Sequence, residues 1–441
     1  MNLTRRDFTA ITASAGACQL MGANLDSGSR QFMVAQRPSP FEKGKTISYI
    51  GLGGGRRFPE KAGGRLNVST SFDYDAAEKR IDYALAHGIN FFDTASEYHH
   101  GESERFYGKV LSKYPREKYT FCTKMSPWQI RTLQDGKKLF SEQLEKCRMD
   151  SFDIYLLHCV VREEDFERTY VKTGILDYLR DERENGRIKR LGFSFHGRPD
   201  FLQRLLDMGF WEVVMLLVNG KDWESANRTK DLLQMVRAKN LPVLGMESLC
   251  GGVLAHLKPS AHAVLSQTKP GVSDAAWSLR FAASVPGVIC ALTGFSRFEH
   301  LVENIETFDS QAFRPMTQEE LEVYFKAIAL ELAGLKGVPC SECAYCMPCP
   351  YGVDIPGVFH VWNTRIRLTG IPDPSDQSGM RKFLCEYRER LPSLRDASRC
   401  IGCGDCEKRC PQWQFVIPEE LSKIDAYMSA AQRREYDLRL D

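Results

Sequence analysis

Short apolar runs alternate with longer amphipathic runs between about Thr46 and Phe308. Eight of the short runs are rich in β-branched and aromatic residues, and a helical pattern follows each of them. This alternation favours parallel strands joined by crossover helices. The eight predicted strands read ISYIGLGG, INFFDTA, YTFCTKM, FDIYLLH, RLGFSF, EVVMLLVN, LPVLGMES and GVICALTGF.

The helical patterns between these runs have recognisable ends. One helix is expected from Asp75 to His87, where Gly88 stops it, and another from Ile175 to Arg187. Eight β/α units of this kind predict an α/β fold, the (β/α)8 TIM barrel. Active sites of such barrels lie at the C-terminal ends of the strands, so polar residues at those ends are candidates for chemistry.

Polar side chains stand near the ends of four successive predicted strands. They are Asp93 after the second, Lys124 in the third, His158 at the end of the fourth and Ser194 in the fifth, with Tyr98 in the loop beyond Asp93. Each residue alone has an ordinary structural explanation, such as a helix cap or simple packing. Together on one rim they predict an active site.

These residue types suit proton-coupled hydride transfer to a carbonyl. A tyrosine hydroxyl is a weak acid with a pKa of about 10, and a neighbouring ammonium lowers that pKa. We expect Lys124 to do this for Tyr98, with Asp93 paired to Lys124. His158 would orient the substrate oxygen through a hydrogen bond while Tyr98 protonates it.

The residues around this candidate site resemble the aldo/keto reductase family. The resemblance rests on NFFDTASEY at 90–98, on Gly101 to Glu104 with Gly108, and on FCTKM and YLLHC. It spans roughly residues 44–310, and we place the barrel domain at 44–312. The resemblance implies NADP(H) as cofactor and a catalytic tetrad of Asp93, Tyr98, Lys124 and His158. It also implies cofactor contacts at Ser194, Gly294, Ser296, Arg297, Glu303 and Asn304.

Some positions near the expected nicotinamide depart from the family's pattern. Phe195 stands where an asparagine usually follows the serine, Met215 replaces a glutamine, and Met246-Glu247 replaces an aromatic or basic residue. The tetrad is untouched, so a working enzyme with altered cofactor contacts is favoured over an inactive barrel.

A hydrolytic zinc site is a weaker alternative for the same rim. His99, His100, His158 and Asp93 are residue types that zinc binds. The adjacent His99 and His100 would point apart, however, and the Lys124 ammonium would lie among the ligands.

A second motif follows the barrel. The run CIGCGDCEKRCP at 400–411 has the C-x2-C-x2-C-x3-C-P spacing of bacterial ferredoxins, and CSECAYCMPCP at 340–350 has it with a shorter last gap. In two-cluster proteins the fourth cysteine of each run binds the other cluster. The spacing therefore predicts two 4Fe-4S clusters, one on Cys340, Cys343, Cys346 and Cys410 and one on Cys400, Cys403, Cys406 and Cys349.

Zinc is the main alternative for paired CxxC motifs, but eight cysteines with a proline after each fourth one suit cubanes better. Disulfides are a weaker alternative still. The cysteines at 122, 147, 159, 250, 290 and 385 lack ligand spacing and are assigned to packing. Helical patterns at 358–368 and 380–390 indicate a mainly helical, two-cluster ferredoxin-like domain at 325–441. The whole pattern resembles aldo/keto reductases with a C-terminal 4Fe-4S dicluster domain.

The net charge and the hydropathy of the chain limit the classes of partner and the locations that we expect for the protein. The 59 basic and 57 acidic residues leave a formal net charge of +2, which would not hold a polyanion, so no nucleic-acid partner is expected. No run of about 18 apolar residues predicts a transmembrane segment. TRRDF at 4–8, followed by an uncharged tract, is similar to a twin-arginine export signal, which we assign with its linker to 1–36. Export to the periplasm is expected, with the cytoplasm as the alternative.

The two motifs together predict an oxidoreductase. We expect NADP(H)-linked reduction of a small-molecule carbonyl, or oxidation of the alcohol, with Tyr98 as general acid/base. A 4Fe-4S cluster accepts one electron whereas a nicotinamide transfers two as hydride. The clusters are therefore expected to be structural or to be fed by a redox partner protein. The alternative is an iron–sulfur electron-transfer protein whose barrel binds a ligand or partner without turnover.

Overall fold

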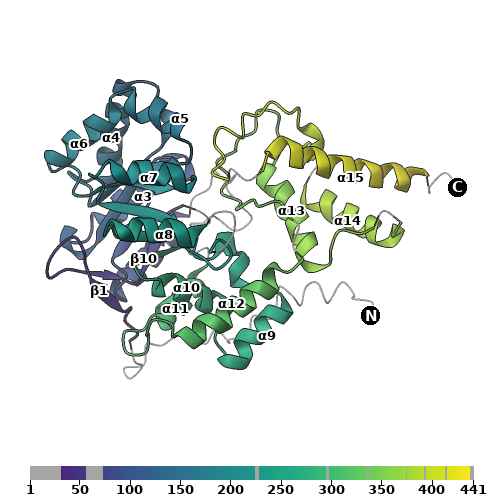
Figure 1. Ribbon diagram of the computed structural model, residues 1–441, viewed down its shortest axis with the longest axis horizontal. Coiled ribbons are helices and arrows are strands. Elements are labelled where there is room, and N and C mark those ends of the chain that lie inside the picture. The colour runs from purple at the N-terminus through teal and green to yellow at the C-terminus, as the bar shows by residue number, and fades with distance from the viewer. Residues whose placement is uncertain are drawn as a thin grey trace. The chain divides into compact units, whose positions relative to one another are not determined.

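The computed structural model describes residues 31–55, 73–223, 228–294, 297–334, 337–373, 375–391, 394–412 and 415–437. The twin-arginine motif at 4–8 and the predicted cofactor residue Ser296 lie outside these ranges. Within them the chain forms a barrel of strands with surrounding helices, and a helical C-terminal region drawn in green to yellow in Figure 1. In the same ranges, no helix combines the length and the hydropathy needed to span a bilayer.

Eight parallel strands close into a barrel in the order β10-β3-β4-β5-β6-β7-β8-β9. Their bounds are β3 Ile50–Gly53, β4 Phe91–Asp93, β5 Thr120–Met125, β6 Ile154–Val160, β7 Leu191–Phe195, β8 Val213–Leu217, β9 Val243–Met246 and β10 Val288–Thr293. The expected TIM barrel is thereby confirmed. Strands β6 and β7 are buried at every residue, because side chains fill the barrel inside and helices cover its outer face.

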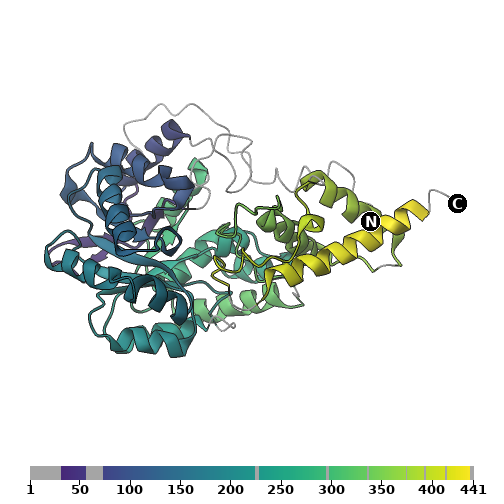
Figure 2. The same cartoon turned by 90° about the horizontal axis from the view of Figure 1, so that it is seen from above.

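Helices follow the strands and surround them, as the two perpendicular views in Figures 1 and 2 show. Their bounds are α2 Tyr74–Ala86, α3 Glu102–Leu111, α4 Leu133–Cys147, α5 Glu163–Phe166, α6 Ile175–Glu184, α7 Pro199–Asp207, α8 Thr229–Ala238, α9 Pro259–Thr268, α10 Asp274–Ser284 and α11 Phe298–Thr307. The helix predicted at 75–87 is α2. The helix predicted to reach Arg187 is α6, which ends earlier because Gly186 adopts a left-handed φ of 79°.

The first predicted strand, ISYIGLGG, is divided in two. Thr46–Ser48 forms β2, which pairs antiparallel with β1 at Gln36–Pro38, and only the second half forms barrel strand β3. The Ser48 hydroxyl donates to the Ile50 carbonyl at 2.7 Å where the chain passes from one strand to the other. Ile47 of β2 is buried in the core cluster of the barrel, so the hairpin contributes to the barrel's interior.

Helices α3 and α4 approach each other closely at Gly108. A Cβ atom at this position would lie 2.2 Å from the carbonyl oxygen of Lys146, so only glycine fits. Helix α4 is fixed at its start by a capping box between Thr132 and Asp135. This packing sets the position of α3, which begins directly after the turn that carries Tyr98.

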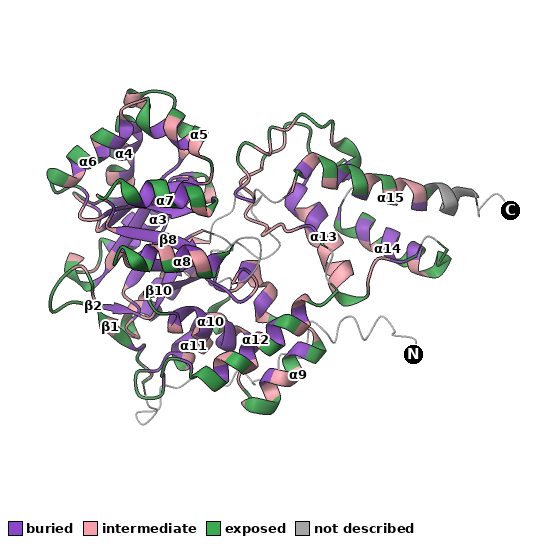
Figure 3. Cartoon of the chain, viewed as in Figure 1, coloured by how far each residue is buried: buried purple, intermediate pink, exposed green. Residues whose placement is uncertain are grey.

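The interior of the barrel is filled by apolar side chains from its strands, and Figure 3 shows the strands coloured as buried. Members of this cluster include Phe91, Cys122, Ile154, Leu156, Val213, Met215, Leu244, Cys290 and Leu292. The core is continuous from strand to strand, so close-packed apolar side chains support the polar residues at the rim.

Helix α12, at Gln318–Leu332, packs against the barrel's helices. The Tyr324 hydroxyl donates to Ser278, and the Tyr324 ring stacks on Phe281 with 4.9 Å between the ring centroids. The predicted start of the C-terminal domain at residue 325 falls inside this helix.

The C-terminal region contains three further helices, α13 Ile355–Leu368, α14 Gln377–Arg390 and α15 Ile417–Asp437. The predicted helical runs at 358–368 and 380–390 lie inside α13 and α14, so the helical character of this region is confirmed. All three helices contribute apolar side chains to one core, among them Val358, Phe359, Phe383, Leu384, Leu421 and Ile424. The two cysteine loops lie against this core through Cys340, Cys346, Cys349, Cys400, Cys406 and Cys410.

The cysteines that lack ligand spacing divide into two groups. Those at 122, 147, 159, 250 and 290 are buried, as expected for small apolar side chains. Cys385 is exposed, so its assignment to packing was wrong. Helix α14 buries Phe383, Leu384 and Tyr387 on its core side and leaves Cys385 on the solvent side.

Candidate active site

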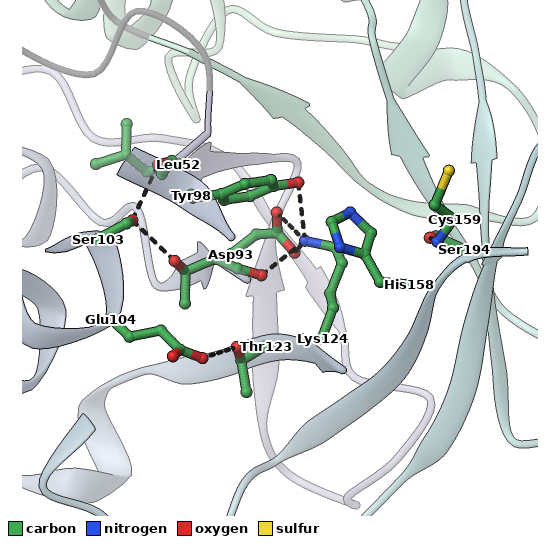
Figure 4. A network of polar contacts seen from close by, with 12 residues as sticks. Leu52, Asp93, Tyr98, Ser103, Glu104, Thr123, Lys124, His158, Cys159 and Ser194 are labelled. Atoms are coloured by element: carbon green, nitrogen blue, oxygen red, sulfur yellow. Dashed lines mark hydrogen bonds and ion pairs between the residues drawn. The ribbon is translucent and has the colours of Figure 1, made fainter. Parts of the chain in front are cut away.

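A buried ion pair lies at the rim of the barrel. Lys124 Nζ, from β5, lies 2.7 Å from each carboxylate oxygen of Asp93, at the end of β4 (Figure 4). It also donates to the Thr94 carbonyl at 2.8 Å. Burial alone would lower the pKa of Lys124, but the Asp93 carboxylate more than offsets this, so the Lys124 pKa lies above its ordinary value. The ammonium therefore stays charged although it is almost fully buried.

Tyr98 lies beside this ion pair. Its residue begins the 3-10 turn Tyr98–Gly101, and its hydroxyl oxygen accepts a hydrogen bond from Lys124 Nζ at 3.4 Å. The ring packs against Gly55, where a Cβ atom would lie 3.1 Å from the nearest ring carbon. His99 and His100 follow in left-handed conformations, with φ of 50° and 57°. This strained turn aims the hydroxyl at Lys124.

The pKa of Tyr98 differs from the sequence-based expectation. Burial and the Asp93 carboxylate raise the Tyr98 pKa above its ordinary value, and this outweighs the lowering by Lys124. The expected lowering by the Lys124 ammonium is present, but burial outweighs it and the Asp93 carboxylate adds to the rise in the Tyr98 pKa. Tyr98 is therefore a protonated phenol at neutral pH, which is the form of a proton donor.

His158, in β6, completes the group and is uncharged. Burial, with the nearby Lys124 cation, lowers its pKa well below 6.5. Its Nδ1 lies 3.2 Å from Ser126 Oγ, and Ser126 in turn accepts a hydrogen bond from Ser96 at 3.0 Å. Donation from Ser126 to Nδ1 would leave the imidazole proton on Nε2. In that tautomer His158 donates a hydrogen bond from Nε2 into the site.

A second polar network supports β5 from behind. Thr123 donates to the Glu104 carboxylate at 2.7 Å (Figure 4), and Gln143 donates to the same oxygen and, at 3.0 Å, to the Lys124 carbonyl. The Tyr155 hydroxyl donates to Gln143. These bonds join α3, α4 and two strands, so Lys124 is held from the backbone as well as by Asp93.

A residue of the first cysteine loop reaches this site. The Tyr345 hydroxyl lies 2.9 Å from His158 Nε2 and also hydrogen-bonds the Tyr98 hydroxyl. Its ring packs edge-on against His158 and lies 5.1 Å from the Trp128 ring, between centroids. Sequence reasoning missed Tyr345 and Trp128, because a contact across 187 positions leaves no local signal.

The site opens into a cavity of about 910 Å³ that the barrel and the C-terminal region line together. It is lined by all four tetrad residues and, among the predicted cofactor residues, by Ser194, Gly294, Glu303 and Asn304. Arg297 is exposed and pairs with Glu299 at 3.4 Å instead. The structure therefore brings eight of the ten predicted catalytic and cofactor residues to one cavity, with Ser296 outside the described ranges.

The lining contains polar groups that suit a nucleotide cofactor. Ser248 and Thr293 are almost fully buried, line the cavity, and have hydroxyls without a hydrogen-bond partner among the described residues. Gly251 and Gly252 allow a close approach of the backbone nearby. Phosphate or amide oxygens would satisfy these hydroxyls, so the residues fit NADP(H). Ser248 follows β9, and the strand-end rule that found Asp93 could also have found it.

Three of the unusual positions also line the cavity. Met215, Met246 and Glu247 face it, whereas Phe195 packs against Phe193 and Phe201 outside it. Ser194 Oγ is already used, since it accepts a hydrogen bond from the Cys159 amide at 2.8 Å. The surface around Met215 is therefore more apolar than a glutamine would make it.

The eight predicted cluster ligands gather in two neighbourhoods. Burial raises the pKa of Cys346, and so do the neighbouring Cys343, Cys340 and Cys410. Burial likewise raises the pKa of Cys406 to about 11, followed by the Glu407 carboxylate, with smaller contributions from the neighbours Cys400 and Cys403. A second cavity, of about 360 Å³, is lined by Cys346, Cys349, Cys400, Cys403 and Cys406.

These neighbourhoods have the chemistry of cluster sites. Among the described residues, no three His, Cys, Asp or Glu side chains converge closely enough to hold one metal ion. A 4Fe-4S cubane does not need its cysteines to converge on one point, because each cysteine binds a different iron atom of the cluster. Thiols packed together in apolar surroundings are unfavourable as thiolates, and iron would compensate their charge. The residues thus fit iron–sulfur clusters, and the number of clusters stays a prediction.

Known proteins resemble this chain in sequence. D-arabinose 1-dehydrogenase of Saccharomyces cerevisiae is 28% identical over 254 residues, covering 52% of this chain and 70% of that protein. L-galactose dehydrogenase of Arabidopsis thaliana is 24% identical over 270 residues, covering 56% of this chain and 82% of that protein.

Solved structures share the fold. An aldo-keto reductase of Bacillus halodurans in its holo form superposes with a TM-score of 0.53 at 19% identity, covering 67% of this chain and 96% of that one. An aldo/keto reductase of Klebsiella pneumoniae in complex with NADP and acetate gives a TM-score of 0.50 at 20% identity, covering 69% of this chain and 96% of that one.

Two family models match the two regions. Residues 339–416 match the 4Fe-4S dicluster domain, which contains both cysteine runs. Residues 50–322, more than half of the chain, match the aldo/keto reductase family. The chain therefore belongs to the aldo/keto reductase family, with a 4Fe-4S dicluster domain after the barrel.

Proposed function

We propose that this protein is an NADP(H)-linked oxidoreductase that reduces a small-molecule carbonyl or oxidises the corresponding alcohol. The observation that carries the proposal is the group of a charged Lys124–Asp93 pair, a protonated Tyr98 and a neutral His158 at one cavity. A general acid, a group that positions it and a neutral hydrogen-bond donor are what carbonyl reduction requires.

Each tetrad residue has a separate task in this proposal. Tyr98 gives its proton to the carbonyl oxygen, or removes the proton of the alcohol in the opposite direction. Lys124 donates to the Tyr98 oxygen and stabilises the phenolate left behind. Asp93 keeps Lys124 in place, and His158 donates from Nε2 to the substrate oxygen.

The cofactor would be held along the remaining cavity lining. NADP(H) supplies or accepts the hydride when bound. Ser194, Ser248 and Thr293 offer hydroxyls, and Gly294, Glu303 and Asn304 line the same cavity. The NADP found in the Klebsiella pneumoniae relative supports this choice. Arg297, although exposed, would be drawn to a 2′-phosphate near the start of α11.

The C-terminal region would bind two 4Fe-4S clusters in the sets that the spacing predicts. Each cluster exchanges single electrons, so we propose a structural role or a separate redox partner protein rather than direct exchange with the nicotinamide. The twin-arginine motif supports export, which stays a prediction. A protein exported folded would carry its cofactors with it.

A second candidate function is favoured by one observation. Tyr345 occupies the space between Tyr98 and His158, where a substrate oxygen would bind. If this arrangement were permanent, the protein would be an iron–sulfur electron-transfer protein whose barrel does not turn over.

One titration separates the two functions. The anaerobic protein with its clusters is titrated with NADPH, and nucleotide fluorescence and cluster absorbance are followed together. The expected result is NADPH binding without cluster bleaching, followed by oxidation of NADPH when 4-nitrobenzaldehyde is added. Tyr98→Phe should keep NADPH binding and lose turnover by about 100-fold to 10,000-fold. Unchanged turnover in Tyr98→Phe, or no NADPH binding at all, would contradict the proposal.

A further inference from the structure

The Tyr345 hydroxyl makes the two hydrogen bonds that an alcohol substrate would make. Its oxygen lies 2.9 Å from His158 Nε2. The Tyr345 hydroxyl is also hydrogen-bonded to the Tyr98 hydroxyl. An alcohol in this site would use the same two partners, His158 Nε2 and the Tyr98 oxygen.

We propose that Tyr345 is an internal competitor for the substrate-oxygen site, so that a substrate binds only by displacing it. This inference rests on the proposed function, since it takes Tyr98 and His158 as the groups that bind the substrate oxygen. It makes a residue of the cysteine loop a determinant of substrate binding by the barrel. This competition would select among substrates. A substrate has to offer an oxygen and has to contact Trp128 well enough to compensate for the contacts that Tyr345 gives up.

The loop is built to present this side chain. Glu342 and Ala344 adopt left-handed conformations, with φ of 57° and 60°, which non-glycine residues rarely do. The Glu342 carboxylate is bound by His360 Nδ1 of α13 at 2.8 Å. Such conformations persist only where surrounding contacts hold them. Tyr345 also lies between Cys343 and Cys346, so cluster binding at these cysteines would fix its backbone.

The cost of displacement appears in the apparent affinity. If only a small fraction of molecules has Tyr345 outside the site, the apparent dissociation constant rises by the inverse of that fraction. Tyr345→Phe removes both hydrogen bonds but keeps the ring. With about 0.5–1.5 kcal/mol for each net hydrogen bond, loss of the pair should enlarge the open fraction roughly tenfold.

The first measurement uses turnover of 4-nitrobenzaldehyde with NADPH by the holoprotein. Tyr345→Phe should lower KM roughly tenfold and change kcat less than about twofold. Tyr351→Phe is the matched control, since Tyr351 is exposed, lies in the same loop and is not among the described residues that line the tetrad cavity. Its KM should stay at the wild-type value. Iron content and visible absorption must be equal in all three proteins.

The second measurement needs no turnover. Diethyl pyrocarbonate acylates the unprotonated nitrogen of a neutral imidazole, and tautomer exchange makes His158 Nε2 reactive once Tyr345 no longer covers it. Peptide mass spectrometry reads each histidine separately. Tyr345→Ala should speed the modification of His158 at least about tenfold, while the other eight of the nine histidines keep their rates. Tyr351→Ala should leave all of them unchanged.

The outcomes separate the inference from the proposed function. A fall in kcat at constant KM in Tyr345→Phe would overturn the competitor role, because Tyr345 would then assist the reaction. An unchanged His158 rate in Tyr345→Ala would also overturn it. Faster His158 modification without turnover in any variant would support occupancy of the site by Tyr345 and reject the proposed function instead.

Discussion

The barrel and the C-terminal region hold their functional side chains in different ways. In the barrel, Asp93, Lys124 and His158 come from strands whose closed ladder fixes each Cα atom, and the packed interior supports them. In the C-terminal region the cysteines lie on loops before and between the helices, where several of them pack, partly buried, against a small helical core. The barrel is therefore expected to keep its site without help, whereas the cysteine loops depend on what their thiols bind.

The largest expected effect comes from breaking the barrel's own support. Lys124→Met would leave the buried Asp93 carboxylate without its cation, at a cost of about 3–5 kcal/mol in the free energy of unfolding. Chemical unfolding of the anaerobic protein measures this loss. The control is Lys138→Met, since Lys138 is exposed and its pair with Glu142 is a surface one. Equal stability of the two variants would show that the rim does not depend on the ion pair.

The cysteine loops are tested by removing one ligand from each predicted set. Cys410→Ser and Cys349→Ser should each lower the iron content by about half, because each fourth cysteine serves a different cluster. Electron paramagnetic resonance of the reduced proteins should then show two different remaining clusters. The barrel's unfolding should change little in both. Loss in Cys410→Ser of the cluster on Cys400, Cys403 and Cys406, instead of the cluster on Cys340, Cys343 and Cys346, would refute the crossed assignment.

A smaller effect is expected where the two regions meet through an ion pair. Arg367 Nε of α13 lies 2.7 Å from the Glu331 carboxylate of α12, which is almost fully buried. Arg367→Met removes a charged hydrogen bond and should cost about 1.5–3 kcal/mol in unfolding free energy. The exposed Arg390 of α14 gives the control, Arg390→Met, with a change below about 0.5 kcal/mol. An unchanged free energy of unfolding in Arg367→Met would mean that the attraction between Arg367 and Glu331 only offsets the cost of removing the two charges from water.

The fold was predictable because its pattern is repetitive. Eight apolar runs with helical intervals leave few alternatives, and polar residues at strand ends then point to one rim. The hairpin of β1 and β2 was not predictable, since Thr46–Ser48 reads as part of a longer strand until Ser48 turns the chain. The exposure of Cys385 could not be predicted for a similar reason, because a single cysteine does not show which face of its helix is buried.

The site was predictable in its residue types but not in its energetics. Spacing and strand position single out Lys124 and Tyr98, yet the pKa of Tyr98 depends on burial and on the distance from Asp93, which only the folded structure fixes. Tyr345 was beyond reach because its contact with His158 joins two regions whose mutual packing no local pattern encodes. The sequence therefore predicts site residues that lie at the ends of the barrel strands, but not a site residue such as Tyr345, which comes from another region of the chain.

The smallest expected effect is the absence of a pH dependence in carbonyl reduction between about pH 7 and pH 9. Tyr98 acts as an acid in its protonated form, and that form is lost only as pH rises through the Tyr98 pKa, which burial and Asp93 place above 10. His158 acts while neutral, and that form is lost only as pH falls through a pKa well below 6.5.

Neither group therefore titrates in this window, and kcat/KM for reduction should vary less than about twofold across it. The profile is recorded with saturating NADPH and subsaturating 4-nitrobenzaldehyde, with NADPH binding checked separately at each pH. A tenfold decline per pH unit that begins near pH 8 would mean that the lowering of the Tyr98 pKa by Lys124 outweighs burial and the Asp93 carboxylate. In that case the Asp93 carboxylate would neutralise the ammonium less than its 2.7 Å contacts indicate.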